Sequence, residues 1–229
     1  MKGILITLEG GEGSGKTTII KELANQLADK EFKFILTREP GGTPIAEQIR
    51  NILLDQNNKA LDNDAEALLH TAARVQHYNE LIKPNLEKGI NVISDRYLDS
   101  SLVYQGIARG AGVWNILEQN LKANIQVPDI TFFIDVDPEE AFKRIEINHR
   151  YLNRMDNEDM EFHRKVYEGY HEIAKDLFPE RIKVIDGKRP VEDIVQDLIK
   201  YIDEYIKTSN ELKEFDKRGS TDVNDSLLH

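Results

Sequence analysis

A glycine-rich run near the start of the chain carries the residue types that hold nucleotide phosphates. Residues 10–17 read Gly-Gly-Glu-Gly-Ser-Gly-Lys-Thr and match the pattern G-x-x-x-x-G-K-[ST] in full. In such a loop the backbone N–H groups surround a β-phosphate, the lysine reaches the β- and γ-oxygens, and the last hydroxyl can ligate Mg²⁺. A purely structural turn between a strand and a helix has no need of the Lys-Thr pair. The run therefore predicts a nucleotide-phosphate site, although it does not specify a reaction.

Arginine is the next residue type that could do chemistry here. Four arginines fall at the ends of predicted strands or on segments just after them: Arg38, Arg50, Arg74 and Arg96. Open α/β sheets bind their ligands at this edge, and the arginine fork matches phosphate oxygens two at a time. Any one of them alone fits a surface ion pair equally well. Together they predict a second phosphate-bearing substrate beyond the one held by the glycine-rich loop.

The segment Asp95-Arg96-Tyr97 ends a predicted strand and adds an acidic group to this edge. Asp95 would lie near Mg²⁺, and Arg96 near the phosphoryl group that is transferred. Asp95 also fits the simpler role of a helix cap. The segment thus has one functional and one structural interpretation.

A second set of arginines predicts a lid. Arg144, Arg150 and Arg154 bracket a segment between two predicted helices, and a lid at approximately residues 144–156 could close over ATP. A solvated basic loop is the alternative interpretation. The six histidines show no convincing spacing for metal ligation, and His70 is the one retained as a candidate site residue.

Short β-rich runs alternate with long amphipathic stretches, and these elements must position the residues above. The predicted strands, each apolar on both faces, are Ile4–Leu8, Phe34–Thr37, Asn91–Asp95, Ile130–Asp135 and Ile182–Asp186. Helices are predicted from Pro138, capped by Asp137, to about Asn148, from about Asp156 towards Phe178, and from Pro190 to Lys207. The last helix carries an apolar stripe at Ile194, Leu198, Ile202 and Ile206. We expect an α/β fold with a parallel sheet covered by helices on both faces.

Composition limits the remaining possibilities. The chain has 229 residues, a formal net charge of −11 and no cysteine, which argues against a nucleic-acid partner and excludes disulfides and thiolate chemistry. We expect a single domain over residues 1–207 and a polar, disordered tail over residues 208–229. No segment resembles a signal peptide or a membrane span, so we expect a cytoplasmic protein without a membrane partner.

Three sequence runs extend the glycine-rich loop into a family resemblance. They are residues 9–18, residues 37–43 (Thr-Arg-Glu-Pro-Gly-Gly-Thr), and residues 95–101 with Tyr104-Gln105-Gly106 and Arg109-Gly110 after them. Over roughly residues 2–207 the chain resembles the bacterial thymidylate kinases, P-loop enzymes that phosphorylate dTMP with ATP. The resemblance implies a nucleoside-monophosphate-kinase-like fold with a five-stranded parallel sheet and a short lid. It also implies a homodimer, and Mg²⁺ accompanying ATP.

The resemblance also implies roles for individual residues. ATP would bind Gly10, Gly11, Glu12, Gly13, Ser14, Gly15, Lys16, Thr17 and Thr18, with Lys188 beside the adenine. The acceptor would bind Glu12, Arg38, Pro40, Arg50, His70, Arg74, Arg96, Ser101, Tyr104 and Gln105, with Arg74 and Gln105 on the base edge. Catalysis would involve Lys16, Asp95 and Arg96, with Thr17 and Asp95 as metal ligands. Because the glycine-rich loop carries no arginine, the catalytic arginine would come from the lid, as Arg150 or Arg154.

One position departs from the family pattern. His70 stands four residues before Arg74, where the family has a phenylalanine that stacks on thymine. A neutral imidazole can still stack, but it is smaller and polar. The leading hypothesis is ATP-dependent phosphorylation of dTMP to dTDP by direct in-line transfer, in dTTP synthesis. The alternatives are the same chemistry on dUMP or a 5-substituted dUMP, and a P-loop nucleotide-binding module without catalysis.

Overall fold

The sheet sets the frame of the fold. The computed structural model describes residues 2–30, 32–147, 154–155 and 157–225. Over these residues, five parallel strands pair in the order β2-β3-β1-β4-β5. They are β1 (Leu5–Glu9), β2 (Phe34–Arg38), β3 (Asn91–Asp95), β4 (Ile130–Asp135) and β5 (Ile182–Asp186). The predicted α/β class with a five-stranded parallel sheet is confirmed.

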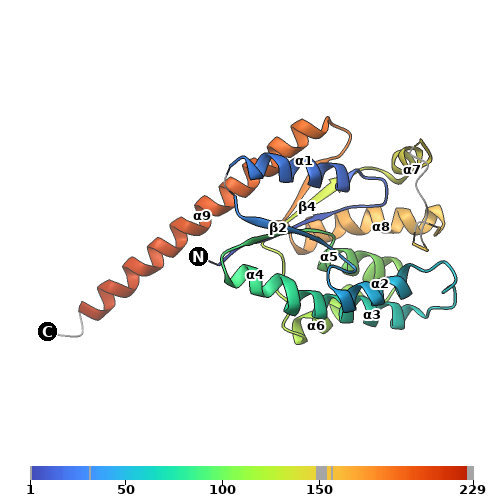
Figure 1. The fold of residues 1–229 in the computed structure, drawn as a ribbon, viewed down its shortest axis with the longest axis horizontal. Coiled ribbons are helices and arrows are strands. Elements are labelled where there is room, and N and C mark those ends of the chain that lie inside the picture. Colours follow the sequence, from blue (N-terminus) through green and yellow to red (C-terminus); the bar gives the residue numbers. More distant parts are fainter. Residues whose placement is uncertain (1, 31, 148–153, 156, 226–229) are drawn as a thin grey trace.

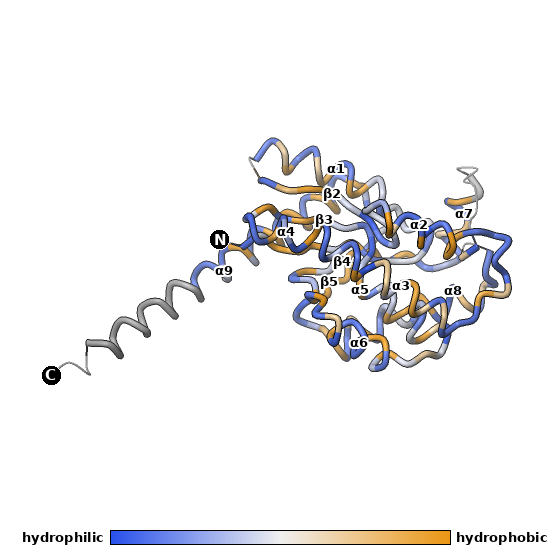
Figure 2. Tube along the Cα trace, turned by 60° about the horizontal axis from the view of Figure 1, so that its bottom comes forward, coloured by the Kyte–Doolittle hydropathy of each residue, from blue (hydrophilic) through white to orange (hydrophobic). Residues whose placement is uncertain are grey.

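Helices connect the strands and cover both faces of the sheet (Figure 1). They are α1 (Lys16–Ala28), α2 (Pro44–Leu54), α3 (Asn63–His77), α4 (Lys83–Glu87), α5 (Leu98–Ser101), α6 (Val113–Lys122), α7 (Pro138–Ile147), α8 (Met160–Glu172) and α9 (Val191–Asp225). Three π-helical segments follow directly after α3, α5 and α8: η1 (Tyr78–Ile82), η2 (Leu102–Ala108) and η3 (Ile173–Leu177), respectively. Hydrophobic and hydrophilic residues alternate along the helices around the sheet (Figure 2), as expected for helices that bury one face.

Successive residues of the central strands point to opposite faces, so each strand contributes to two core layers. Ile6 of β1 packs with residues of α1 and α9, whereas its neighbour Leu5 packs with residues of α3, α4, α5 and α6. Phe132 and Phe133 of β4 likewise point to opposite faces. Phe132 packs in the same layer as Ile6, and Phe133 packs against α8 and η2. The two layers hold the sheet rigid, so its carboxyl edge is a stable support for a site.

The edge strands are less buried than the sequence predicts. Leu36 of β2 and Val184 of β5 are 45% and 46% exposed. Each of these strands has a neighbour on one side only, so the prediction that all five strands are buried on both faces is wrong at the edges. An apolar sequence run does not distinguish an edge strand from a central one.

The C-terminal helix runs beyond its predicted end. Ile194, Leu198 and Ile202 of α9 lie in the core, as the predicted stripe requires. The helix then continues past Lys207 to Asp225 and projects from the body of the molecule (Figure 1). No proline follows Pro190, and Gly219 is the first glycine after Gly187. Between Lys207 and Arg218 the backbone therefore meets neither a proline nor a glycine that would end the helix.

The other helix signals agree closely with the structure. Asp137 accepts a hydrogen bond from the backbone N–H of Glu140 at 2.9 Å, at the start of α7. Helix α8 begins at Met160, four residues later than predicted, because Asp159 caps it by accepting from the N–H of Phe162 at 2.8 Å. No helix among the described residues is long and apolar enough to cross a membrane.

Candidate active site

A cavity of about 460 Å³ opens at the carboxyl edge of the sheet. Of the predicted site residues, it is lined by Glu12, Gly13, Ser14, Gly15, Lys16, Thr17, Thr18, Arg38, Pro40, Arg50, His70, Arg74, Asp95, Arg96, Tyr104 and Gln105. It is also lined by Glu39, Leu54, Tyr97 and Ser100, which had no predicted role, and by Arg144, Ile145 and Met155 of the predicted lid segment. The glycine-rich loop and the arginines from β2, α2, α3 and β3 therefore face one shared space.

The glycine-rich loop takes its shape from backbone conformations that glycine adopts freely. Gly13 has a φ of +75°, and a side chain there would clash with the carbonyl oxygen of Ala141 in α7. Gly15 has a φ of +92° and caps the N-terminus of α1. The first turn of α1 therefore directs its backbone N–H groups and the positive end of its dipole toward the cavity.

Lys16 is held against this loop rather than extended into solvent. Its Nζ donates to the carbonyl oxygens of Gly10 at 3.0 Å and Gly11 at 2.9 Å, and to Oγ of Ser14 at 3.2 Å. Burial, with the charge of Arg96 nearby, lowers the pKa of Lys16 to about 8. The loop thus fixes an ammonium group where a nucleotide phosphate would contact it.

Arg96 occupies the middle of the cavity in a constrained conformation. Its φ is +68°, in the left-handed region, and its backbone N–H donates to the carbonyl oxygen of Leu8 at 3.0 Å. The guanidinium donates through Nη2 to Oε1 of Glu12 at 2.5 Å and through Nη1 to Oγ of Ser100 at 3.1 Å. The guanidinium carbon lies 5.1 Å from the ring centroid of Tyr104. Strand β3 and these contacts aim the cation between the glycine-rich loop and the predicted acceptor side.

Glu9, at the end of β1, contacts two residues that also contact Arg96: Ser100 and Tyr170. Its buried carboxylate accepts from Oγ of Ser100 at 2.5 Å, from the hydroxyl of Tyr170 at 2.9 Å and from the backbone N–H of Tyr97 at 2.8 Å. Burial and the nearby charge of Asp99 raise the pKa of Glu9 to about 7. Glu9 had no predicted role of its own, although a carboxylate at the end of a buried strand is a signal that the sequence offers.

Two further arginines lie on the acceptor side. Arg38 donates through Nη2 to both carboxylate oxygens of Glu47, at 2.9 and 3.0 Å. Arg50 donates through Nη1 to the carbonyl oxygen of Pro40 at 2.7 Å. Burial and the charge of Arg38 lower the pKa of Arg50 below its usual value, which is the expected result where cations converge. With Arg96 they form a concentration of positive charge in an acidic protein.

Arg74 is buried and nearly saturated with hydrogen bonds. Its Nε donates to Oε2 of Glu39 at 2.7 Å and its Nη1 to Oδ1 of Asn120 at 3.2 Å. Its Nη2 donates to the carbonyl oxygen of Tyr97 at 3.0 Å and to Oγ of Ser101 at 2.8 Å. Ser101 does not line the cavity. It accepts a hydrogen bond from Arg74 and so helps to hold the guanidinium in position. Glu39 also contacts Nδ1 of His77 at 3.0 Å, which fixes both partners.

His70, Tyr104 and Gln105 form the adjoining wall of the cavity. Burial lowers the pKa of His70 to about 4, so the ring is neutral at physiological pH. The ring of Tyr104 packs edge-on against Phe162 and Tyr170 at centroid distances of 6.1 and 6.4 Å. An aromatic wall next to amide and guanidinium groups suits a flat heterocycle with polar edges.

The structure does not bring every predicted residue to the cavity. Arg154 donates through Nη2 to Oε2 of Glu66 at 2.6 Å and through Nε to the carbonyl oxygen of Leu53 at 2.8 Å, and it does not line the cavity. Lys188 pairs with Asp137 at 2.6 Å, also outside the cavity. Arg150 and most of the predicted lid lie outside the described residues. Arg144 does line the cavity, and its Nη1 donates to the carbonyl oxygen of Gly187 at 3.1 Å.

The predicted metal ligands face the same cavity. Thr17 lies in the first turn of α1, and Asp95 ends β3 next to Arg96. Among the described residues, no group of three or more histidine or acidic side chains could hold a metal ion by itself. A hydroxyl and a carboxylate fit Mg²⁺, which is commonly bound through one or two carboxylates together with substrate phosphates.

Comparisons with known proteins agree on one family. A family model described as thymidylate kinase matches residues 8–198. A thymidylate kinase of Bacillus velezensis is 45% identical over 209 residues, which cover 90% of this chain and 98% of that protein. A thymidylate kinase of Mycoplasma capricolum is 46% identical over 219 residues, which cover 95% of this chain and 100% of that protein. The crystal structure of a thymidylate kinase from Ehrlichia chaffeensis is similar with a TM-score of 0.73 and 35% identity, over 88% of this chain and 100% of that one.

Proposed function

The chain belongs to the thymidylate kinase family, and from this premise we propose how its cavity carries out the ATP-dependent phosphorylation of dTMP. The enzyme is a nucleoside monophosphate kinase. We assign it direct in-line transfer of the γ-phosphoryl group to the acceptor phosphate, which requires positioning and charge neutralisation rather than a covalent enzyme intermediate. We assign this activity to residues 1–207 as one domain.

The donor side is the glycine-rich loop with the start of α1. Backbone N–H groups of residues 13–17 would hold the β-phosphate, and Nζ of Lys16 would exchange its loop carbonyl contacts for phosphate oxygens. Thr17 and Asp95 would hold Mg²⁺, which would neutralise phosphate charge when bound. Lys188 would lie beside the adenine, from the loop after β5.

The acceptor side is the arginine cluster with the aromatic wall. Arg38, Arg50 and Arg96 would bind the acceptor phosphate, because guanidinium forks match its oxygens. Glu12 would accept from the sugar 3′-hydroxyl while it keeps Arg96 oriented. Tyr104 would pack against the deoxyribose, with Pro40 beside it.

The catalytic arginine of the lid is a further part of the proposal. Arg150 or Arg154 would meet the charge that develops on the transferred group. To reach the phosphates, Arg154 would have to give up its contacts with Glu66 and the carbonyl oxygen of Leu53. That rearrangement would accompany closure of residues 144–156 over the donor.

One observation carries the proposal: a phosphate-binding loop and a separate cluster of arginines line the same cavity. The test is an assay of ADP release with ATP, Mg²⁺ and one of dTMP, dUMP, dCMP or dGMP, with a reaction that contains no acceptor as the control. ADP release that depends on dTMP is expected. Release at the same rate without an acceptor would favour a nucleotide-binding module or simple ATPase instead.

The same chemistry on dUMP is a second candidate activity, because His70 stands where the family has phenylalanine. A smaller polar ring gives the thymine methyl a weaker apolar wall. One methyl group in an apolar pocket accounts for about 1–3 kcal/mol, so we propose kcat/KM values for dTMP and dUMP within about a hundredfold of each other.

His70→Phe is expected to shift preference toward dTMP by about two- to tenfold, the equivalent of about 0.5–1.5 kcal/mol of aromatic contact. The measurement is the ratio of kcat/KM for dTMP and dUMP, in the original enzyme and the variant, at pH 6 and pH 8. Because the pKa of His70 is lowered to about 4, the ring is neutral at both pH values, and each ratio should be the same at both. An unchanged ratio in the variant would show that imidazole stacks as phenylalanine does.

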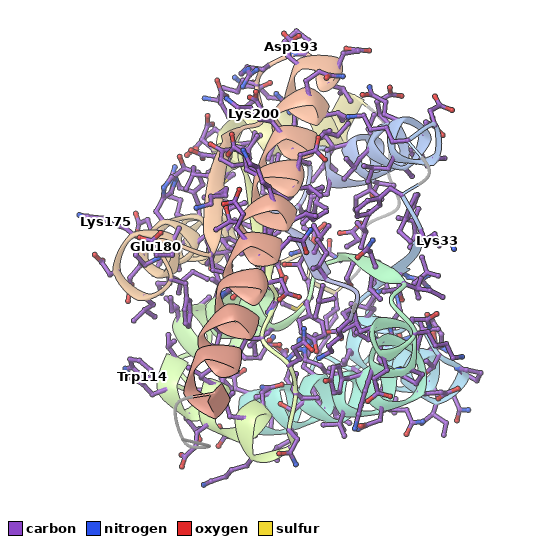
Figure 3. The ribbon with its side chains drawn as sticks, turned by 90° about the vertical axis from the view of Figure 1, so that its left-hand side faces the viewer. Lys33, Trp114, Lys175, Glu180, Asp193 and Lys200 are labelled. Atoms are coloured by element: carbon purple, nitrogen blue, oxygen red, sulfur yellow. The ribbon has the colours of Figure 1, made fainter. Side chains whose placement is uncertain are left out.

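We also propose that the enzyme is a cytoplasmic homodimer. Exposed apolar side chains lie on three neighbouring helices: Ile45 and Ile52 on α2, Leu68 on α3, and Trp114 and Leu121 on α6. Trp114 is 68% exposed and projects away from the body of the molecule (Figure 3). A second copy of the chain would cover these residues.

Leu68→Glu is therefore expected to convert the dimer to a monomer, because a charge in the covered face would lose its hydration. Sedimentation velocity of both proteins at micromolar concentration is the measurement. Val184→Glu is the matched control and should leave the dimer intact, because Val184 is also an exposed apolar residue, 46% exposed against 58% for Leu68, but lies on β5. A dimer that persists in Leu68→Glu would place the interface elsewhere.

A further inference from the structure

Glu66 of α3 is a fully buried carboxylate next to the cavity but not part of its lining. It stands four residues before His70 and eight before Arg74, so the three side chains follow one face of α3. His70 and Arg74 do line the cavity. Glu66 had no predicted role, and a carboxylate is costly to bury in a protein unless other groups pair with it.

Three groups donate to this carboxylate. Nε2 of Gln105 donates to Oε1 at 2.8 Å, Nη2 of Arg154 donates to Oε2 at 2.6 Å, and Nε of Arg109 lies 3.5 Å from Oε1. Burial by itself would raise the pKa of Glu66, but the hydrogen bonds from Gln105 and Arg154 lower it below its usual value. Glu66 is therefore ionised at neutral pH.

An ionised carboxylate accepts hydrogen bonds and cannot donate one. The amide of Gln105 must therefore turn its NH₂ toward Glu66, and the opposite orientation would bring two acceptors together. This contact uses one of the two N–H groups of Nε2 and turns the carbonyl oxygen Oε1 of Gln105 away from Glu66, where no described residue donates to it. Gln105 itself lines the cavity.

Arg74 supplies the complementary group on the same wall. Its four hydrogen bonds engage no more than four of the five N–H groups of the guanidinium. At least one N–H therefore remains for a ligand. The wall presents a fixed acceptor from Gln105 and a fixed donor from Arg74.

This pair matches one class of pyrimidine. Thymine and uracil carry an N3–H donor beside the O4 acceptor, whereas cytosine carries the N3 acceptor beside an amino donor. A free amide could rotate to suit either base, but an amide held by an acceptor-only partner cannot. A cytosine edge would leave buried polar groups without partners, which is a costly mismatch.

We propose that Glu66 is a positioning residue that sets base specificity: it locks the amide of Gln105 so that the wall accepts thymine and uracil and rejects cytosine. Arg109 holds Glu66 in its accepting form, and Arg154 adds a second cation in the arrangement described here, before any movement toward the phosphates. The inference rests on the proposed function, because it assigns the pyrimidine to the wall that His70, Arg74 and Gln105 form.

Glu66→Gln tests the lock, because glutamine keeps the shape of the side chain and can both donate and accept. The ratio of kcat/KM for dTMP to that for dCMP should fall at least about tenfold. The loss should come mainly from a higher KM for dTMP, with the KM for ATP unchanged. Glu158→Gln is the matched control, because Glu158 is also a carboxylate partner of Arg109, at 2.5 Å, but does not contact Gln105. That control should leave the ratio unchanged.

Gln105→Met keeps the proposal testable if Glu66→Gln does not fold. Methionine removes the amide and leaves Glu66 with its two arginines, so the same loss of discrimination is expected. In a folded Glu66→Gln/Gln105→Met double variant, the ratio should match that of Gln105→Met alone. Full discrimination in Gln105→Met, or in folded Glu66→Gln, would overturn the inference while dTMP phosphorylation by the original enzyme stands. An original enzyme that does not use dTMP would instead overturn the proposed function.

Discussion

Lys16→Ala is expected to lower kcat for dTMP phosphorylation by about a hundredfold or more, the typical cost of removing one preorganised charge contact in a transition state. The side chain donates only to the glycine-rich loop and to Ser14. It takes no part in the apolar layers around the sheet. Thermal unfolding should therefore change little while transfer is nearly abolished.

Lys21→Ala is the matched control for this variant. Lys21 is an exposed lysine of the same helix, α1, so the substitution removes the same charge away from the cavity. The measurements are kcat and KM for ATP, together with the melting temperature of each protein. More than about a tenth of the original kcat in Lys16→Ala would contradict the assigned role of the loop.

Arg96→Ala is expected to lower kcat/KM for dTMP by about a hundred- to a thousandfold. The guanidinium lies between the donor loop and the acceptor side, so the variant loses both acceptor binding and charge neutralisation. It also leaves Glu12 without its 2.5 Å partner, which adds repulsion toward an anionic acceptor. The KM for ATP should change far less than the KM for dTMP.

Steady-state kinetics with each substrate varied in turn measure this difference. Arg164→Ala on α8 is the matched control, because Arg164 is an exposed arginine paired only with Glu139 among the described contacts. A drop of less than tenfold in Arg96→Ala would remove Arg96 from the acceptor site. Equal rises in both KM values would indicate general disruption of the cavity.

The strands were predictable because a strand that is buried in a parallel sheet is a nearly continuous run of apolar residues. All five predicted strands match observed ones to within one residue at each end. Their order was not readable from composition, since pairing joins residues far apart in the chain. The end of α9 was also not predictable from polarity, because a polar helix and a polar tail share the same composition.

The cavity residues were predictable where a motif fixes both residue type and spacing. Residues 12–17 of the glycine-rich loop, Asp95 and Arg96 are examples and line the cavity, whereas Gly10 and Gly11 of the same loop do not. The supporting carboxylates were not predictable in the same way. Glu39, Glu47 and Glu66 meet arginines that lie 35, 9 and 88 positions away in the chain. Only tertiary structure brings such pairs together, so the contact between Arg154 and Glu66 could not be expected from the sequence, where the family resemblance implied a catalytic role for Arg150 or Arg154.

The π-helical segment η2 limits how this active site can change during evolution. Tyr104 and Gln105 lie on η2, where hydrogen bonds join residues i and i+5 instead of i and i+4. Removing one residue would return the segment to α-helical geometry and turn the side chains on one side of the cut by about 100° relative to those on the other. Side chains on η2 can therefore be exchanged one at a time, whereas an insertion or deletion would misdirect Tyr104 and Gln105 relative to the part of the wall that α3 provides. Divergence in acceptor preference is thus confined to substitutions.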